Sequence, residues 1–138
     1  MRVTVMSRER AVRYSYGKHE QKAVAVSIGT PGEVYIKEIR PTVDNGIVAV
    51  VRLYFEDAET GDGCITVGDA ERIKALLQRF PEHDVIIHCD VGVSRSAGVA
   101  AAVLKHCTGD DTQIFDNPVY RPNMRCYRTV LNVLEGVV

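Results

Sequence analysis

Hydrophobic and polar positions along the chain follow two periods, one typical of strands and one typical of helices. Residues 2–7 alternate apolar and polar side chains, and residues 22–32 and 84–88 contain short apolar runs, which predicts three strands. Residues 47–56 are almost continuously apolar and β-branched, which predicts a strand buried on both faces. Residues 33–39 fit either a short strand or a helical turn.

Segments with a helical period lie between these strands. Ser7 can cap a helix that ends near Gly17, and residues 67–80 carry apolar side chains at helical spacing. An alanine-rich helix is expected over residues 96–107, followed by loop or short turns and a last helix over 122–137 with Pro122 at its start. Strands that alternate with helices predict a single three-layer α/β domain over residues 1–138, with a central, largely parallel sheet flanked by helices.

Composition and charge narrow the class of protein. The chain has 138 residues, of which 46% are hydrophobic and 25% charged, as in an ordinary globular domain. Its net charge is −1, so we expect neither nucleic acid nor a membrane surface as a partner. The chain lacks an apolar run of the roughly 18 residues that span a bilayer and the apolar region of a signal peptide. We therefore expect a cytoplasmic protein, and we expect it to be a monomer.

The four cysteines show no CxxC pair and no metal-ligand spacing with the histidines, so we expect neither a metal nor another cofactor. In a reducing compartment they are free thiols. Most free cysteines are small core residues, and we expect this of three of them, Cys107 and Cys126 included.

The sequence HCDVGVSRS, residues 88–96, joins a predicted strand to the alanine-rich helix. Such a turn lies at the carboxyl end of the strand and directs its backbone N–H groups toward a helix N-terminus, where anions bind. Gly92 allows the backbone to curl, and the planar fork of Arg95 can bind two phosphate oxygens at once. The predicted phosphate-binding residues are therefore Asp90, Val91, Gly92, Val93, Ser94 and Arg95.

Cys89 lies at the base of this loop. Positively polarised surroundings lower a thiol pKa from about 8.5 into roughly the 3.5–7.5 range, which gives a thiolate able to attack phosphorus. Ser96 can donate a hydrogen bond to the sulfur when it leaves, or it can simply cap the helix. His88 can fix the loop backbone or bias the thiol, or it can be a structural core residue.

These residues match the H-C-x5-R-S/T signature of the cysteine-dependent protein tyrosine phosphatase superfamily, and HCDVGVSRSAG resembles the compact dual-specificity-type phosphatases most. The order of elements extends the resemblance from residue 47 to the last helix. It implies a metal-independent phosphatase that works without a cofactor, through a cysteinyl-phosphate intermediate. The implied partner is a phosphorylated protein or peptide, with phosphotyrosine as substrate and phosphoserine and phosphothreonine as further candidates.

The reaction requires a general acid, because the oxygen of a phosphoester is a poor leaving group unless it receives a proton. The polar loop after the strand of residues 47–56 offers several carboxylates. The resemblance implies an aspartate on such a loop upstream of the cysteine, and Asp57, which stands 32 residues before Cys89, matches that spacing best. Asp62 and Glu56 remain the alternatives.

Two further features bear on the loop. Pro122-Asn123 resembles the Pro-Asn pair that follows the signature in dual-specificity phosphatases, which implies that Asn123 orders the turn beside the loop; helix capping is its alternative role. Asp90 and the absence of lysine within the loop argue against polyanionic substrates such as inositol lipids.

The alternative to an enzyme is a catalytically silent module of the same fold that binds phosphate or a phosphopeptide. Two other enzyme classes fit less well. Low-molecular-weight phosphatases carry their loop near the N-terminus, and rhodanese-like sulfurtransferases do not need an arginine at the sixth position after the cysteine.

Overall fold

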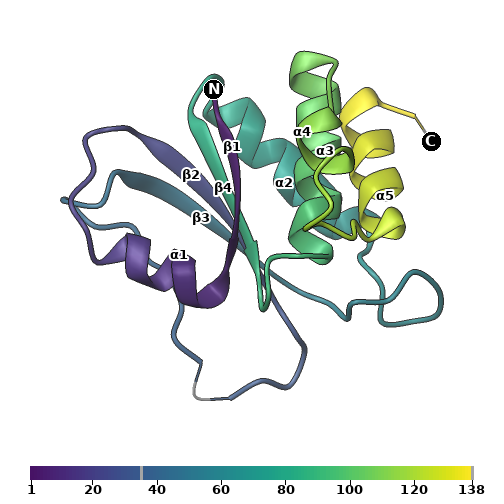
Figure 1. Cartoon of the computed structure of the whole chain (residues 1–138), viewed down its shortest axis with the longest axis horizontal. Helices are drawn as coiled ribbons and strands as arrows, with labels where there is room; N and C mark the ends of the chain where they lie inside the picture. The colour runs from purple at the N-terminus through teal and green to yellow at the C-terminus, as the bar shows by residue number, and fades with distance from the viewer. Residues whose placement is uncertain (35, 138) are drawn as a thin grey trace.

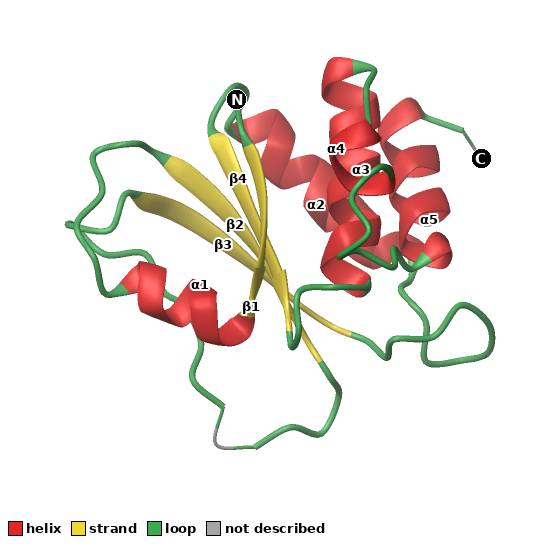
Figure 2. Cartoon of the chain, viewed as in Figure 1, coloured by secondary structure: helices red, strands yellow, loops and turns green. Residues whose placement is uncertain are grey.

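The fold is built on a four-stranded sheet in which all pairings are parallel (Figures 1 and 2). The computed structural model describes residues 1–34 and 36–137. The strand order is β1-β4-β2-β3. The strands are β1 (Val3–Ser7), β2 (Ala23–Gly29), β3 (Ile47–Tyr54) and β4 (Asp84–Cys89). The predicted α/β class and parallel sheet are confirmed.

Helices cover both faces of the sheet. In Figure 1, α1 lies against one face and the other helices lie against the opposite face. Two hydrophobic clusters match this division, a small one around Ala11 and a large one that includes most of the buried side chains. The helices are α1 (Arg8–Ser15), α2 (Val67–Arg79), α3 (Arg95–Thr108), α4 (Thr112–Phe115) and α5 (Met124–Glu135). The predicted three-layer arrangement is confirmed.

Side-chain caps begin three of these helices. The Ser7 hydroxyl accepts a hydrogen bond from the Arg10 N–H, as predicted for the first helix, and Thr66 forms a capping box with Asp69. The last helix begins at Met124 and not at Pro122, because Asn123 is its cap. Pro122 therefore precedes the cap and does not start the helix.

β3, the strand predicted to be buried on both faces, is exposed at part of one face, and it lies at an edge of the sheet. Val48 and Tyr54 are exposed, while every residue of β2 is buried between β4 and β3. A β-branched run favours a strand at any position in a sheet. The local pattern predicted the strand itself, but which faces of a strand are covered depends on packing between distant segments, and this is why the prediction of burial on both faces was wrong.

The segment after β2 also differs from expectation. Residues 33, 34 and 36–39 form neither a strand nor a helical turn, and the remaining residue of that prediction, Tyr35, lies outside the described residues. The segment is fixed to β3 by side chains: Arg52 Nη2 donates to the Ile39 carbonyl, and the Tyr54 hydroxyl donates to Glu38. Side-chain contacts therefore hold this stretch in place of a backbone ladder.

Two smaller predictions are corrected at the C-terminal end of α3. Cys107 is exposed and not a core residue, because the last turn of α3 extends beyond the packed layers, whereas Cys64, Cys89 and Cys126 are buried. The region predicted as loop or short turns contains the four-residue helix α4, which inserts Ile114 into the main core.

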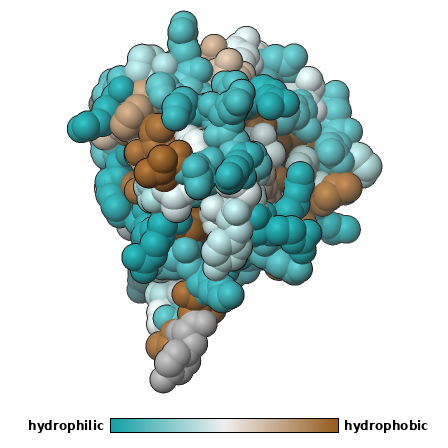
Figure 3. Space-filling view, turned by 90° about the vertical axis from the view of Figure 1, so that its left-hand side faces the viewer, coloured by the Kyte–Doolittle hydropathy of each residue, from teal (hydrophilic) through white to brown (hydrophobic). Residues whose placement is uncertain are grey.

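The outer surface is largely polar. Figure 3 shows the face that carries α1, where apolar side chains lie in small separate patches on a hydrophilic background. Within residues 1–34 and 36–137, every helix is too short or too polar to cross a membrane.

Candidate active site

The carboxyl ends of three strands meet at the N-terminus of α3. β4 ends at Cys89, and α3 begins at Arg95 after a five-residue loop. Neighbouring parallel strands end at the same edge of a sheet, so β2 and β3 also point here. Arg95 Nη1 joins them, since it donates to the carbonyls of Gly29, at 3.3 Å, and Phe55, at 2.8 Å. The predicted loop therefore lies at the centre of this edge.

The loop curls tightly over the junction of β1 and α1. Gly92 has a φ of 80°, and a Cβ at this position would lie 2.6 Å from the Ser7 nitrogen and 2.8 Å from the Met6 carbonyl oxygen. The Arg8 N–H donates to the Asp90 carbonyl at 3.2 Å. A glycine is therefore required both by the backbone conformation and by the close approach of the two segments.

Cys89 is buried at the base of the loop. Its sulfur shares a hydrogen bond of 3.0 Å with the Ser96 hydroxyl and accepts one of 3.3 Å from the Gly92 N–H. Burial alone raises the pKa of this thiol. The hydrogen bonds from Ser96 and Gly92 and the charge of Arg95 outweigh burial, so that the pKa of Cys89 lies below its ordinary value. The thiolate is thus favoured by its surroundings.

Arg95 is buried and firmly held. Besides the two carbonyls, Nη1 donates to the Thr30 hydroxyl at 3.0 Å, and Nη2 donates to Asp90 Oδ2 at the same distance. Within the described residues, Nε makes no hydrogen bond. The guanidinium is therefore fixed in orientation by two backbone carbonyls, a hydroxyl and a carboxylate.

Asp57 and Asn123 lie together beside the loop. Asp57 Oδ1 accepts hydrogen bonds from the Ser94 hydroxyl at 2.8 Å and from Asn123 Nδ2 at 2.9 Å. Neither alternative acid, Glu56 or Asp62, has a side-chain hydrogen bond to the loop in the described part of the chain. A cavity of about 380 Å³ lies here, lined by Asp57, Glu59, Ser94, Arg121, Pro122 and Asn123.

Asn123 combines both roles that the sequence suggested for it. Its Oδ1 accepts from the Cys126 N–H, which caps α5, and its Nδ2 also reaches the Ala58 carbonyl. Its backbone N–H donates to the Ser94 carbonyl at 2.9 Å, and the Arg121 N–H donates to the Val93 carbonyl at 3.0 Å. The start of α5 thus supports the loop from outside.

His88 is buried away from the sulfur. Its Nε2 lies 2.7 Å from the Ser27 hydroxyl oxygen, and its Nδ1 lies 3.3 Å from the Cys89 carbonyl oxygen. Burial lowers the pKa of His88, so the ring is neutral near pH 7. The geometry places His88 against the backbone of Cys89 and not against its thiol.

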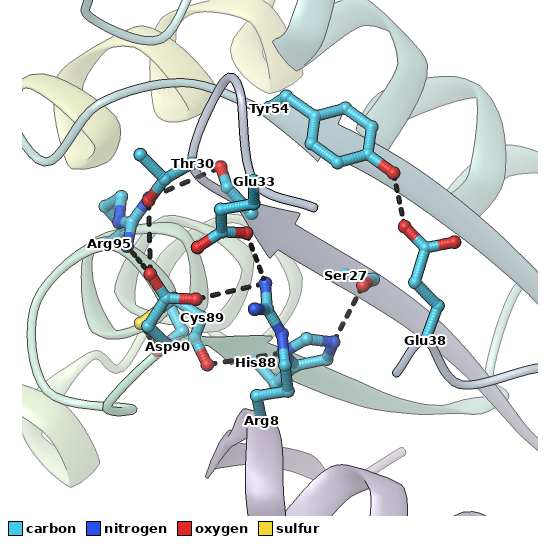
Figure 4. A network of polar contacts seen from close by, with 12 residues as sticks. Arg8, Ser27, Thr30, Glu33, Glu38, Tyr54, His88, Cys89, Asp90 and Arg95 are labelled. Atoms are coloured by element: carbon cyan, nitrogen blue, oxygen red, sulfur yellow. Dashed lines mark hydrogen bonds and ion pairs between the residues drawn. The ribbon is translucent and has the colours of Figure 1, made fainter. Parts of the chain in front are cut away.

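Sequence reasoning missed Thr30 and Arg8. Thr30 directly follows β2, so the rule that parallel strands end at one edge was a signal that it lies near the loop. Arg8 begins α1 after β1, the strand on the other side of β4, and Figure 4 shows it between Glu33 and Asp90. Its position near the loop could be predicted only if the strand order was already known.

Val91, the most exposed residue of the loop, points to solvent at 72% exposure. Among the described residues, no group of three or more His, Cys, Asp or Glu side chains is placed to hold a metal ion. A cavity of about 790 Å³, lined mainly by residues of α2, the turn after it and the last turn of α3, contains none of the predicted site residues.

Several solved structures have a fold similar to that of this chain. A mouse protein described as a dual specificity phosphatase, in complex with zinc tungstate, superposes with a TM-score of 0.64 at 17% identity, covering 97% of this chain and 82% of its own. The human tyrosine phosphatase-like serine/threonine/tyrosine-interacting protein superposes with a TM-score of 0.63 at 15% identity. The superposition covers 93% of this chain and 87% of that protein. PTPMT1 in complex with PI(5)P superposes with a TM-score of 0.60 at 14% identity. The superposition covers 98% of this chain and 91% of PTPMT1.

These likenesses show that the chain has the fold of the compact dual-specificity phosphatases. At the level of sequence, no family model matches the chain, and no curated protein is similar enough to count as a relative.

Proposed function

We propose that the protein is a metal-independent phosphoprotein phosphatase that hydrolyses phosphotyrosine, and phosphoserine or phosphothreonine as well, through a cysteinyl-phosphate intermediate. One observation carries the proposal. The Cys89 sulfur lies at the base of a curled loop, within hydrogen-bond distance of Ser96 and the Gly92 N–H, and the loop closes on a fixed Arg95. An inert core cysteine needs none of these donors.

Phosphate binding is the first step of the proposed reaction. The backbone N–H groups of residues 90–95 and the guanidinium of Arg95 hold the phosphate oxygens, and the N-terminus of α3 adds a partial positive charge. The phosphorus then lies above Cys89. Tungstate, the oxyanion bound to the mouse protein of this fold, has the tetrahedral shape of phosphate.

Cleavage of the ester follows. The thiolate of Cys89 forms a bond to phosphorus while the bond from phosphorus to the ester oxygen breaks. Asp57 acts as the general acid and gives a proton to the leaving oxygen, which departs as a tyrosine or serine hydroxyl. Its contacts with Ser94 and Asn123, at 2.8 and 2.9 Å, keep this carboxyl beside the loop.

Hydrolysis of the intermediate completes the cycle. The Asp57 carboxylate takes a proton from a water molecule whose oxygen attacks phosphorus, and the bond from sulfur to phosphorus breaks. The departing thiolate is stabilised by the Ser96 hydroxyl, which lies 3.0 Å from it. Inorganic phosphate is released, and Cys89 returns to its starting state.

The substrate class rests on the loop and its surroundings. The sequence has no aromatic-rich insertion that would deepen the pocket for phosphotyrosine alone, so a shallow cleft is expected to accept all three phosphorylated residues. Asp90 places a carboxylate at the rim and disfavours polyanions. Because PTPMT1, solved with PI(5)P, shares this fold, a phosphopeptide panel should include that lipid as the competing substrate.

The alternative is a silent module that binds phosphate or a phosphopeptide without turnover. A phosphatase-like interacting protein has the same fold, so the fold does not decide between the two functions. The presence here of Cys89, Arg95, Ser96 and a carboxylate beside the loop favours the enzyme.

A direct assay separates the two. Hydrolysis of p-nitrophenyl phosphate is measured with EDTA present, for the wild type, for Cys89→Ser and for Cys107→Ser, a matched control at an exposed cysteine. The proposal expects turnover by the wild type and the control and none by Cys89→Ser. Tight phosphopeptide binding with no turnover by any of the three would establish the silent module instead.

A further inference from the structure

A chain of alternating charges runs from Glu33, in the segment after β2, through Arg8 at the start of α1 to the phosphate-binding loop (Figure 4). Glu33 Oε2 lies 3.1 Å from Arg8 Nη2, which lies 3.0 Å from Asp90 Oδ1. Asp90 Oδ2 in turn lies 3.0 Å from Arg95 Nη2. One carboxylate, that of Asp90, is therefore shared between the arginine of the loop and a second arginine outside it.

We propose that Arg8 is a positioning residue of the phosphate site, which holds the Asp90 carboxylate at the rim and offsets its negative charge where the phosphate binds. This inference rests on the proposed phosphate site and deepens it. Arg8 acts through Asp90 and does not itself touch the substrate.

Two contacts tie Arg8 to the loop independently of each other. Its backbone N–H donates to the Asp90 carbonyl, and its guanidinium faces the Asp90 carboxylate. Asp90 Oδ1 is buried and has no well-aligned hydrogen-bond partner within the described residues, although Arg8 Nη2 lies 3.0 Å away. The contact of Arg8 with this oxygen is therefore mainly one of charge, and the buried oxygen depends on that charge.

The sign of the effect follows from the charges. Arg8 and Arg95 carry two positive charges, balanced by the two carboxylates of Glu33 and Asp90. A phosphate dianion that binds at Arg95 meets the Asp90 carboxylate as a neighbour of the same sign. Because the side chains of Arg8 and Asp90 are only 18% and 32% exposed, water screens their interaction incompletely. Loss of Arg8 should therefore weaken phosphate binding.

The test measures binding of inorganic phosphate by calorimetry, beside KM and kcat for p-nitrophenyl phosphate. Arg8→Gln is expected to raise the phosphate Kd and KM about tenfold, within the usual range for coupled charges, with kcat changed much less. Arg8→Lys keeps the charge and should recover most of the loss. In the Asp90→Asn background, Arg8→Gln should raise Kd less than about threefold, because the carboxylate it offsets is gone.

A second variant, expected to strengthen phosphate binding, distinguishes the role of Arg8 from a general loss of folding. Glu33→Gln frees Arg8 for Asp90 alone and makes the site more positive, so it should lower the phosphate Kd about threefold. A misfolded protein cannot bind phosphate more tightly. Arg13→Gln is the matched control on α1 and should leave Kd and KM as in the wild type. Within the described residues, the Arg13 side chain forms an ion pair with the exposed Glu9 alone.

The outcomes are distinct. An Arg8→Gln protein with wild-type Kd, an equal effect of Arg8→Gln with and without Asp90, or a Glu33→Gln protein that binds phosphate more weakly each overturn the proposal. Phosphate binding does not require turnover. A wild type that binds phosphate, depends on Arg8 and hydrolyses nothing would therefore contradict the proposed enzyme and still support the role of Arg8.

Discussion

The hydroxyl oxygen of Ser96 lies 3.0 Å from the sulfur of Cys89, and both side chains are buried. Ser96 is the second residue of α3, so its position follows from the start of the helix. Its hydrogen bond lowers the pKa of the thiol and can also stabilise the thiolate that leaves phosphorus. One hydroxyl thus bears on the first and the last chemical step.

Replacement of this hydroxyl should slow breakdown of the intermediate most. For Ser96→Ala we expect kcat to fall about a hundredfold, the usual cost of removing one donor to a developing negative charge. Rapid mixing with p-nitrophenyl phosphate should then show a burst of p-nitrophenol equal to the amount of enzyme. Slower turnover with no burst would place the role of Ser96 in the first step alone.

The pH dependence of kcat/KM should be bell-shaped. The pKa of Cys89 lies below its ordinary value, so activity should be lost only as pH falls through that lowered value. Activity should also fall at high pH, where the general acid has lost its proton. Asp57→Asn should lower kcat about 10²–10⁴-fold and flatten the basic limb. The assignment would be wrong if Asp57→Asn kept the basic limb of the pH profile while Asp62→Asn or Glu56→Gln lost it. The general acid would then be Asp62 or Glu56.

Gly92 should be required for a stable loop. Gly92→Ala places a Cβ 2.6 Å from the Ser7 nitrogen at a residue with a φ of 80°. We expect the free energy of unfolding to fall by about 1–3 kcal/mol. We also expect phosphate binding to be lost. Gly109, at the end of α3, has the same φ and no atom within 4 Å of such a Cβ. Gly109→Ala should lose only the smaller backbone cost, measured by urea unfolding, and keep phosphate binding. Wild-type phosphate binding by Gly92→Ala would contradict the tight packing.

His88 should make the folded state sensitive to acid. Burial lowers its pKa in the folded protein below the ordinary 6.5, so the unfolded chain takes up a proton first as pH falls. Its contribution to stability is complete above about pH 6.5 and is lost as pH falls toward the lowered pKa. Urea unfolding should therefore show a smaller destabilisation by His88→Gln at about pH 5.5 than at about pH 7.5. Equal destabilisation at both values would show that His88 does not titrate in this way.

Local patterns predicted the elements of this fold better than their arrangement. Helical spacing and caps such as Ser7 act within a few residues, so α1 and α2 follow from the sequence, as does the loop between Cys89 and Arg95. The edge position of β3 depends on its pairing with β2 alone, which no pattern within residues 47–56 records.

The network around the loop was predicted only in part for the same reason. Cys89, Ser96 and Arg95 are close in sequence, and their spacing already predicts a phosphate site. The contact between Arg8 and Asp90 joins residues from opposite halves of the chain, through the pairing of β1 with β4. A lone arginine at the start of a helix carries no signal of such a partner, so the structure was needed to find it.

The most direct test of the account is to trap the reaction on the enzyme. The protein is mixed with p-nitrophenyl phosphate, quenched in acid during turnover and digested for mass spectrometry. The account predicts one added phosphoryl group on the peptide that contains Cys89, located on its sulfur, with more of it in Ser96→Ala. Turnover with no phosphorylated Cys89 in either protein would contradict the central claim that this sulfur bonds to phosphorus.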